Sequence, residues 1–309
     1  MIPTIRKLKR LHPVILSTLL LLLLILTPPY KDLVAQAHNG SGKTTCFVLG
    51  MLSRVDPKRK IPQAICICPT RELAQQNHAV FVKMGKYTGI TSISYASRDG
   101  FRDDSERIMK EIQRSSGGCQ VLLFSATFDE AVKAFVSRVI KDGNQIFVKK
   151  EELTLEKVKQ YKVQCPDELS KVESLTEEGY ECTSVHGALK QEDRDKIIKE
   201  FKDGLTKVLM TTDLLARGFD QRQVNLVINY DLPIKHDNPS EPDCELYLRR
   251  VGRTGRFGSK GAVFNFLCTD RDRSVMEKIE RHFQHHIPEI RNWRSEEDFE
   301  AALKDAGLL

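Results

Sequence analysis

The chain has 309 residues, of which 40% are hydrophobic, so it is long enough to fold as two domains with separate cores, and a small disulfide-stapled module is excluded. Its eight cysteines include no C-x-x-C pair, which argues against a zinc ribbon or finger and predicts buried or idle thiols in a reducing compartment. The 48 Lys and Arg exceed the 42 Asp and Glu, and the resulting net charge of +6 permits an anionic partner without demonstrating one.

Residues 1–30 are an atypical apolar leader, in which a basic start precedes a nearly continuous apolar run from Val14 to Leu26. As a helix this run would be about 20 Å long, which is short of the roughly 30 Å hydrocarbon layer of a membrane. Three interpretations remain open: buried strand or helix material, a targeting or membrane-contacting segment, and a gene-prediction artefact. The first is favoured because the run leads directly into a nucleotide-binding motif.

From Asp32 onward, short apolar runs alternate with amphipathic stretches, a pattern that predicts an α/β fold of parallel sheets with crossover helices. The predicted strands are residues 32–37, 64–69, 120–127, 181–187, 207–213, 226–233 and 262–267. Helical periodicity predicts helices at residues 44–55, 71–85, 190–204 and 272–284.

The charged segment 149–163 carries no residues typical of a binding or catalytic site, and it divides the alternating pattern of strands and helices into two halves. The sequence shows no short-period repeat, which excludes a solenoid. The predicted organisation is a leader (1–30), a first lobe (31–148), a linker (149–163), a second lobe (164–275) and a C-terminal helical extension (276–309).

Residues 37–44 read AHNGSGKT, a Gly-rich turn between a predicted strand and a predicted helix, which is typical of a phosphate-binding loop. Its backbone N–H groups would face phosphate oxygens at the positive end of the helix dipole. Lys43 would neutralise the β and γ phosphates of ATP, and Thr44 would place its hydroxyl on Mg²⁺. The alternative is a surface glycine turn with an exposed lysine. The predicted nucleotide-binding residues of this loop are Ala37, Gly40, Ser41, Gly42, Lys43 and Thr44.

Residues 247–258, YLRRVGRTGRFG, carry four arginines spaced by glycines, and guanidinium groups bind phosphate oxygens bidentately. Arg253 and Arg256 are candidates to neutralise charge on a transferring phosphoryl group, although such a run taken alone is more often a solvated face. Ser125 and Thr127, at the end of an apolar strand, could relay between a nucleotide site and a neighbouring lobe.

The chain resembles the DEAD-box ATP-dependent RNA helicases, because seven short blocks occur in the order found in that family. These blocks are AHNGSGKT (37–44), PTREL (69–73), SAT (125–127), VHG (185–187), QEDR (191–194), TTDLLARGFD (211–220) and RRVGRTGRFG (249–258). The segments FRDDSERIMKEIQ, QVLLFSATF and INYDLP are most similar to the branch that works in mRNA export at the nuclear pore. The resemblance covers residues 27 to about 290.

The resemblance implies a P-loop NTPase of helicase superfamily 2 with two RecA-like parallel-sheet lobes. It implies local unwinding of RNA duplexes or remodelling of ribonucleoproteins, driven by ATP with Mg²⁺ as cofactor. The implied catalytic residues are Lys43, Thr44, Arg253 and Arg256, the last two acting as arginine fingers, and Gly218 and Asp220 would face the nucleotide. The implied contacts to the RNA backbone, which read no sequence, are Pro69, Thr70, Arg71, Gly187, Gln191, Arg194 and Thr211.

The implied partners are RNA and, by the same resemblance, nuclear-pore or mRNA-export proteins. The implied location is the cytoplasm and nucleus, including the nuclear envelope; membrane or secretory targeting by the leader is the alternative. Lys43 in the first lobe is expected to act on the same triphosphate as Arg253 and Arg256 in the second.

The chain departs from the family where the D-E-A-D block should stand, because the sequence there reads SISYASRDGFRDDSER. Losing the base that positions the attacking water typically costs about 10²- to 10⁴-fold in rate. Asp99, Asp103 and Asp104 lie nearby, but in a polar segment and not after an apolar strand. The adenine-reading segment, two RNA blocks and the opening strand of the second lobe are also missing, so both lobes are predicted to be truncated.

Three hypotheses follow. The first is an ATP-dependent RNA helicase. The second is a degenerate relative that binds nucleotide or RNA and turns over little ATP. The third is a non-catalytic, membrane-associated product of the leucine-rich leader.

Overall fold

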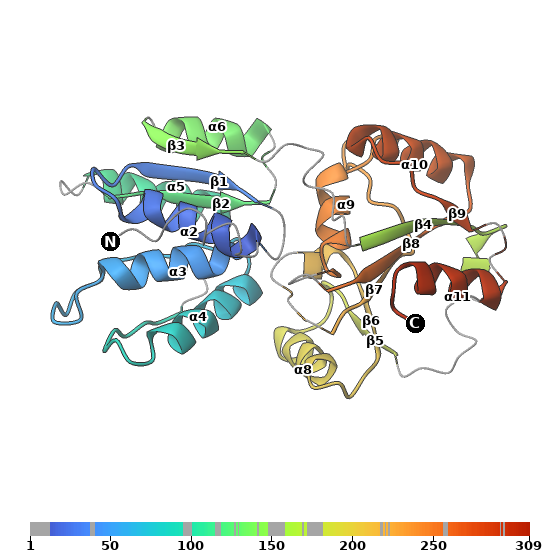
Figure 1. Ribbon diagram of the computed structural model, residues 1–309, viewed down its shortest axis with the longest axis horizontal. Helices are drawn as coiled ribbons and strands as arrows, with labels where there is room; N and C mark the ends of the chain where they lie inside the picture. The colour runs from blue at the N-terminus through green and yellow to red at the C-terminus, as the bar shows by residue number, and fades with distance from the viewer. Residues whose placement is uncertain are drawn as a thin grey trace, which may run out of the picture. The chain divides into compact units, whose positions relative to one another are not determined.

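The computed structural model describes residues 13–37, 41–94, 101–114, 119–126, 128, 130–140, 142–147, 158–168, 170–171, 182–216, 219, 221, 223–255, 259–290, 292 and 294–309. The chain divides into two compact units, Met1–Val148 and Lys149–Leu309, which contain separate sheets (Figure 1). All strand pairing within these sheets is parallel, as the alternating sequence pattern predicts.

The first unit is built on a sheet with the strand order β2-β1-β3. Its elements are α2 (Pro13–Leu26), β1 (Asp32–Gln36), α3 (Lys43–Arg54), α4 (Arg71–Gly85), α5 (Phe101–Arg114), β2 (Leu122–Ser125), α6 (Glu130–Val139) and β3 (Gly143–Ile146). Leu33 and Ala35 of β1 pack in one cluster with α2 and α3, whereas Val34 packs with Val136 and Ile140. This alternation is that of a strand buried on both faces.

The apolar leader forms α2, and this helix is part of the core of the first unit. Leu21 and Ile25 are buried in one cluster with Leu33, whereas Leu23 is exposed. Helix α2 lies so close to α3 that a Cβ atom on Gly50 would come within 3.1 Å of Ile25 Cγ2. The structure therefore supports buried helix among the three interpretations of the leader. Among the described residues, no helix has the length and apolar character needed to cross a membrane.

The strand predicted at residues 64–69 is wrong. Residues 62–68 have no regular structure, and Ile65 is 60% exposed. The alternating pattern of this segment suits a strand, but a strand also needs a hydrogen-bonded neighbour. The three described strands of this unit pair with one another instead.

The second unit contains a sheet with the order β7-β8-β4-β9 and a separate pair, β5-β6. Its strands are β4 (Val158–Gln164), β5 (Cys182–Val185), β6 (Val208–Thr211), β7 (Leu226–Asn229), β8 (Gly261–Leu267) and β9 (Glu289–Ile290). Its helices are α8 (Gln191–Lys202), the short 3-10 helix η2 (Asp213–Ala216), α9 (Cys244–Val251), α10 (Asp270–Phe283) and α11 (Glu296–Asp305). Strand β8 is buried throughout, because α9 and α10 pack on one of its faces and α11 packs on the other.

Two domain boundaries predicted in this half of the chain fall inside elements of the structure. The linker predicted at 149–163 ends in β4, which pairs along its full length with β8. The C-terminal extension predicted at 276–309 begins inside α10, whose Met276 and Ile279 are buried in the core. Charged residues obscured β4, since Lys159 and Lys162 interrupt its buried positions.

Two strands of the second unit present exposed apolar side chains. Val208 and Met210 of β6 are 38% and 55% exposed, and Leu226 and Ile228 of β7 are 38% and 37% exposed. Among the described residues, β6 pairs with β5 and β7 pairs with β8, so each has a second edge without a strand. This arrangement is what the loss of an interior strand from a parallel sheet would produce.

Candidate functional site

The phosphate-loop sequence connects β1 to α3 in the first unit, as its spacing predicts. Gly42 precedes α3 in a left-handed conformation, with φ at 86°, and makes no side-chain cap to the helix. Gly42 has no side chain with which to cap the first N–H groups of α3. Ser41 is buried, and its hydroxyl has no hydrogen-bond partner among the described residues. Gly40, also predicted for this site, lies outside the described residues.

Lys43 and Thr44 open α3 with their side chains held in defined contacts. The Lys43 Nζ atom donates to the Ala37 carbonyl oxygen at 2.5 Å, which closes the loop on itself. Thr44 Oγ1 donates to Asn77 Oδ1 of α4 at 3.3 Å. The loop thus gathers an ammonium group, a hydroxyl and helical N–H groups in one place, a combination that suits a polyphosphate anion.

Ser125 lies next to the start of this loop. It ends β2 in register with Gln36, and its carbonyl oxygen accepts from the Ala37 N–H at 3.2 Å. The Gln36 side chain donates to the Ala126 carbonyl oxygen at 3.1 Å, so the two strand ends are bonded together. Thr127, the second hydroxyl predicted to relay between lobes, lies outside the described residues.

The block Pro69–Arg71 leads into α4, which packs beside the phosphate-loop helix α3. The Thr70 hydroxyl caps α4 by accepting from the Leu73 N–H at 3.2 Å, and Arg71 is exposed on the first turn. The structure therefore places this block and the phosphate loop on neighbouring helices of one unit. Its contact with RNA stays a prediction.

The described residues around the phosphate loop provide only part of a magnesium site. The described residues contain no group of three or more His, Cys, Asp or Glu able to hold a metal ion, which leaves the Thr44 hydroxyl as the predicted ligand. Asp103 and Asp104 belong to the backbone of α5, and Asp99 lies outside the described residues. The first two are thus helical and do not follow a buried strand, as their polar surroundings in the sequence indicate.

In the second unit four residues are predicted to contact RNA: Gly187 and Thr211 lie at the carboxyl ends of β5 and β6, and Gln191 and Arg194 lie on α8. Val185 and Thr211 are register partners there, so the turn at Gly187 lies next to Thr211. Arg194 Nη2 donates to the Gly187 carbonyl oxygen at 2.6 Å, and its Nε donates to the Leu189 carbonyl oxygen at 2.9 Å.

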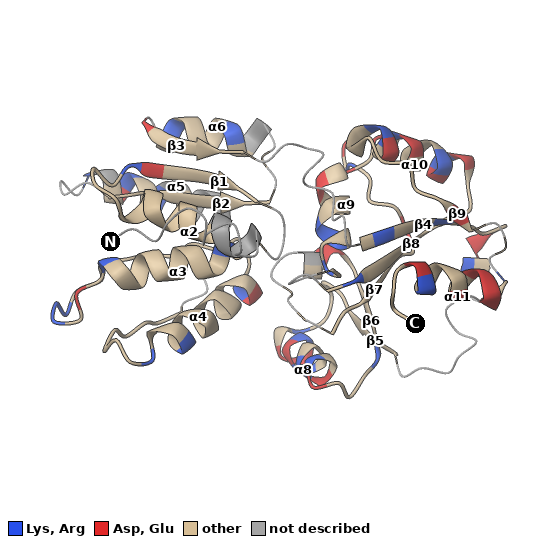
Figure 2. Ribbon diagram, in the orientation of Figure 1, with Lys and Arg blue, Asp and Glu red and all other residues tan. Residues whose placement is uncertain are grey.

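The remaining predicted contact, Gln191, opens α8 and bonds Asp195 at 2.9 Å. The guanidinium of Arg194 therefore shapes the turn that precedes α8. Helix α8 carries charges of both signs (Figure 2), so any affinity for phosphates here depends on particular side chains and not on a uniformly basic face.

The arginine block forms the end of α9 and the turn after it. Arg253 follows α9, and its guanidinium donates to the carbonyl oxygens of Phe219 and Arg249. Arg250 forms an ion pair with Asp213 of η2 at 2.5 Å and donates to the Asp231 carbonyl oxygen at 2.7 Å. The block and the TTDLLARGFD segment thus meet within the second unit. Three further predicted residues, Gly218, Asp220 and Arg256, lie outside the described residues.

Sequence reasoning missed two connections in these sites. Asn77 links α4 to Thr44, although nothing in the spacing of RELAQQNH distinguishes it from a surface amide. Arg250 was one of four arginines in its run, and only the fold shows that it is the one paired with Asp213.

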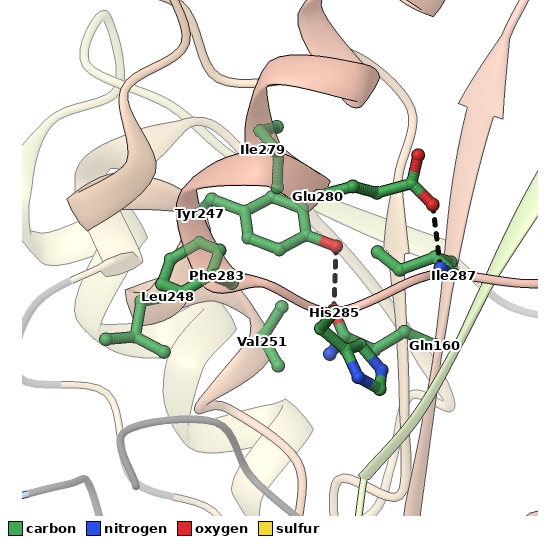
Figure 3. Close-up of a pocket in the computed structure, with 9 residues that line it drawn as sticks. All are labelled: Gln160, Tyr247, Leu248, Val251, Ile279, Glu280, Phe283, His285 and Ile287. Carbon is green, nitrogen blue, oxygen red and sulfur yellow. Dashed lines mark hydrogen bonds between the residues drawn. The ribbon is translucent and has the colours of Figure 1, made fainter. Parts of the chain in front are cut away.

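A pocket between α9 and α10 is not part of these sites. Figure 3 shows the Tyr247 hydroxyl pointing to Gln160, to which it donates at 2.7 Å, and burial raises the pKa of this tyrosine. The other lining side chains are mostly apolar, and none of the predicted site residues is among them. The pocket is therefore a packing feature of the core of the second unit.

Comparison with known proteins gives matches in both halves of the chain. The profile of the DEAD/DEAH box helicases matches residues 21–98, and the helicase conserved C-terminal domain matches residues 139–258. The DEAD-box ATP-dependent RNA helicase 38 of Oryza sativa subsp. japonica is 57% identical over 371 residues, covering 93% of this chain and 74% of the relative. That alignment is longer than the chain itself, so the relative has internal residues that this chain lacks.

Solved structures match the chain over both units. S. cerevisiae Dbp5 bound to RNA and ADP BeF3 aligns with a TM-score of 0.80 at 27% identity, covering 98% of each chain. A Dbp5 variant bound to a Gle1 variant and IP6 aligns with a TM-score of 0.74 at 27% identity, covering 99% of each chain.

Proposed function

The chain belongs to the DEAD-box ATP-dependent RNA helicases, and we propose that it binds ATP at residues 37–44 and RNA through the sugar–phosphate backbone. Its two units are RecA-like lobes, and the Oryza sativa relative has internal residues that this chain lacks. By family it is an enzyme that couples ATP to work on RNA.

The observation that supports nucleotide binding is the loop between β1 and α3. The Ser41 hydroxyl, which is buried and has no partner among the described residues, left-handed Gly42 and the N-terminus of α3 together provide donors for phosphate oxygens. Lys43 would leave the Ala37 carbonyl oxygen to neutralise the terminal phosphates. When bound through Thr44, Mg²⁺ would supply charge neutralisation between the phosphates. ATP affinity is expected to be reduced, because the adenine-reading segment is missing.

For RNA, we propose contacts from one block in each lobe. Pro69, Thr70 and Arg71 would contact the backbone from the first lobe, and the second lobe would contribute Gly187, Gln191, Arg194 and Thr211. Backbone contacts carry no sequence information, so the substrate would be defined as single-stranded or locally melted RNA and not as a particular sequence. The proposed work is local duplex unwinding or ribonucleoprotein remodelling, with Arg253 and Arg256 acting on the γ phosphate.

A second candidate function is nucleotide-dependent RNA binding with little turnover. It is favoured by the missing D-E-A-D block and by the lack of a metal-binding acidic cluster in the described part of the chain. Without a carboxylate to position the attacking water, hydrolysis would be slower by about 10²- to 10⁴-fold than in a relative that retains the block.

The partners we propose follow from the Dbp5 complexes. A Dbp5 variant binds a Gle1 variant with IP6, and a further structure adds Nup159. We therefore propose mRNA-export and nuclear-pore proteins as partners, and the cytoplasm and nucleus as the location. A fluorescent fusion confined to the secretory pathway would contradict this location.

The decisive experiment measures binding and hydrolysis separately in purified protein. Titration with a fluorescent ATP analogue measures binding, and phosphate release with and without RNA measures hydrolysis. Lys43→Ala should abolish both, whereas Lys58→Ala, which alters an exposed lysine outside the loop, should change neither. RNA-stimulated hydrolysis supports the helicase, and binding without hydrolysis above background supports the second candidate. No nucleotide binding at all would reject both.

A further inference from the structure

The irregular segment 62–68 brings two cysteines into contact. Side chains two positions apart in an extended chain point to the same side, and the Cys66 and Cys68 sulfur atoms lie 3.9 Å apart. Cys66 is exposed and Cys68 is half-buried. As part of an interior strand these thiols would be covered, so their exposure follows from the missing strand pairing in this unit.

Cys68 is also connected to the phosphate loop. The Asn77 Nδ2 atom donates to Cys68 Sγ at 3.2 Å, while Asn77 Oδ1 accepts from Thr44 Oγ1 at 3.3 Å. Asn77 is buried, so its amide has little access to water as a substitute partner. A change at the Cys68 sulfur therefore reaches the Thr44 hydroxyl through one side chain.

The two thiols are chemically unequal. The hydrogen bond from Cys66 lowers the pKa of Cys68 to about 7, and the bond from Asn77 acts in the same direction. The same contact raises the pKa of Cys66. Elsewhere, burial raises the pKa of Cys46 to about 12. Since the thiolate is the reactive form, Cys68 is suited to attack and Cys66 to resolve.

We propose that Cys66 and Cys68 form a peroxide-sensitive thiol pair, and that their oxidation to an intramolecular disulfide weakens nucleotide binding through Asn77 and Thr44. The coupling to nucleotide rests on the proposed function of the phosphate loop, whereas formation of the disulfide does not.

The chemistry needs one hydrogen peroxide for each disulfide. The Cys68 thiolate attacks one peroxide oxygen, the O–O bond breaks, and the departing hydroxide takes a proton to become water, which leaves a sulfenic acid on Cys68. The Cys66 sulfur then attacks the Cys68 sulfur, the S–O bond breaks, and a second water leaves with the Cys66 proton. The two sulfurs lose two electrons in total, and the peroxide gains them.

The disulfide would alter the contact with Asn77. The sulfur atoms must approach to about 2.05 Å, and Cys68 is then no longer a thiolate that accepts strongly from Asn77. The Asn77 amide would be left without its partner and would reorient, and Thr44 would lose the acceptor that directs its hydroxyl hydrogen. Loss of one such hydrogen bond corresponds to about two- to tenfold weaker binding.

The disulfide can be tested in the whole chain by mass spectrometry. Trypsin releases residues 61–71 as one peptide whose only cysteines are Cys66 and Cys68. After treatment with equimolar hydrogen peroxide, this peptide should lose two hydrogens and resist alkylation until it is reduced. Cys66→Ser should stop the reaction at a dimedone-trappable sulfenic acid, while Cys182→Ser, which removes another exposed cysteine, should leave the disulfide yield unchanged. A peptide that keeps both thiols overturns the proposal.

Two measurements test whether oxidation of the thiol pair affects nucleotide binding. Oxidation should weaken binding of a fluorescent Mg²⁺–ATP analogue by about two- to tenfold, reversibly with dithiothreitol, and should speed hydrogen exchange at the start of α3 without nucleotide. Reduced Asn77→Leu should show the same weakening, with no further change on oxidation although its disulfide still forms. If neither measurement changes in the oxidised wild-type protein, the coupling is wrong. If exchange responds but the reduced protein binds no nucleotide, the link from the thiol pair to the start of α3 stands, whereas the effect on nucleotide binding fails together with the proposed function.

Discussion

Helix α2 offers a direct test of whether the leucine-rich leader is structural. Ile25 is 1% exposed, and changing it to alanine removes three carbon atoms, which costs about 2.4 kcal/mol in transfer free energy at about 0.8 kcal/mol per methylene. The cavity that remains adds to this cost. Gly50 faces Ile25 at close range without a side chain, so α3 has nothing with which to fill the space. We therefore expect Ile25→Ala to lower the free energy of unfolding by about 3 to 5 kcal/mol.

The matched control is Leu23→Ala on the same helix. Leu23 is 63% exposed, and its truncation should change the free energy of unfolding by no more than about 0.5 kcal/mol. Both substitutions introduce alanine into the same helix, so helix propensity contributes only a few tenths of a kcal/mol to the difference between the two variants, and burial accounts for the rest. Urea unfolding followed by circular dichroism gives the stability, and hydrogen exchange of β1 peptides localises the loss to the first unit. Equal stabilities for the two variants would refute this account of the leader.

Three further outcomes are expected. The logarithm of the RNA affinity should fall linearly with the logarithm of the salt concentration, and Arg71→Ala should make this slope shallower by about 0.7. An affinity that does not depend on salt would contradict binding through the RNA backbone. Among the described residues β6 has one edge without a strand and carries exposed Val208 and Met210, so we expect the protein to self-associate. Met210→Lys should reduce this self-association in analytical ultracentrifugation while leaving the circular dichroism spectrum unchanged, and a monomeric wild-type protein would contradict the expectation. Hydrogen bonds from Tyr161 and Lys159 lower the pKa of Asp305, so this contribution to stability is present above the usual aspartate pKa and is lost as pH falls through the lowered value. Asp305→Asn should therefore show a smaller drop in urea midpoint between pH 6 and pH 3 than the wild-type protein shows.

The strands and helices that the sequence predicts best have a regular hydrophobic period and end at a recognisable turn. The strand predicted at 32–37 and the helix predicted at 44–55 match β1 and α3 closely, because an apolar run, a Gly-rich turn and an amphipathic stretch follow one another. The blocks at Gly187 and Thr211 were placed at the ends of strands for the same reason. The hydrophobic pattern of the sequence is sufficient to predict an element when the burial of each residue is determined by that element alone.

Predictions failed where the environment depends on a distant segment. The alternation in AICIC would be that of a strand if a neighbouring strand were available, and the absence of one turned Cys66 and Ile65 toward solvent. The opposite holds for β4. Its lysines favour a linker, but it pairs with β8 on one side and β9 on the other and is therefore a core strand. Neither outcome is encoded within the segment concerned.

The residues proposed to bind phosphate are present in this chain, whereas the carboxylates that the family uses to cleave it are missing. The phosphate loop stands on β1, which keeps a strand on each side and the buried leader helix beside it. The D-E-A-D carboxylates, by contrast, would come from a segment that is missing from the sequence. The proposed nucleotide binding would depend on donors that are present in the loop, and these would act on the ground state and the transition state alike, whereas the base of the D-E-A-D block acts only in the transition state. The defect should therefore appear in kcat, with nucleotide affinity reduced only by the missing adenine contacts.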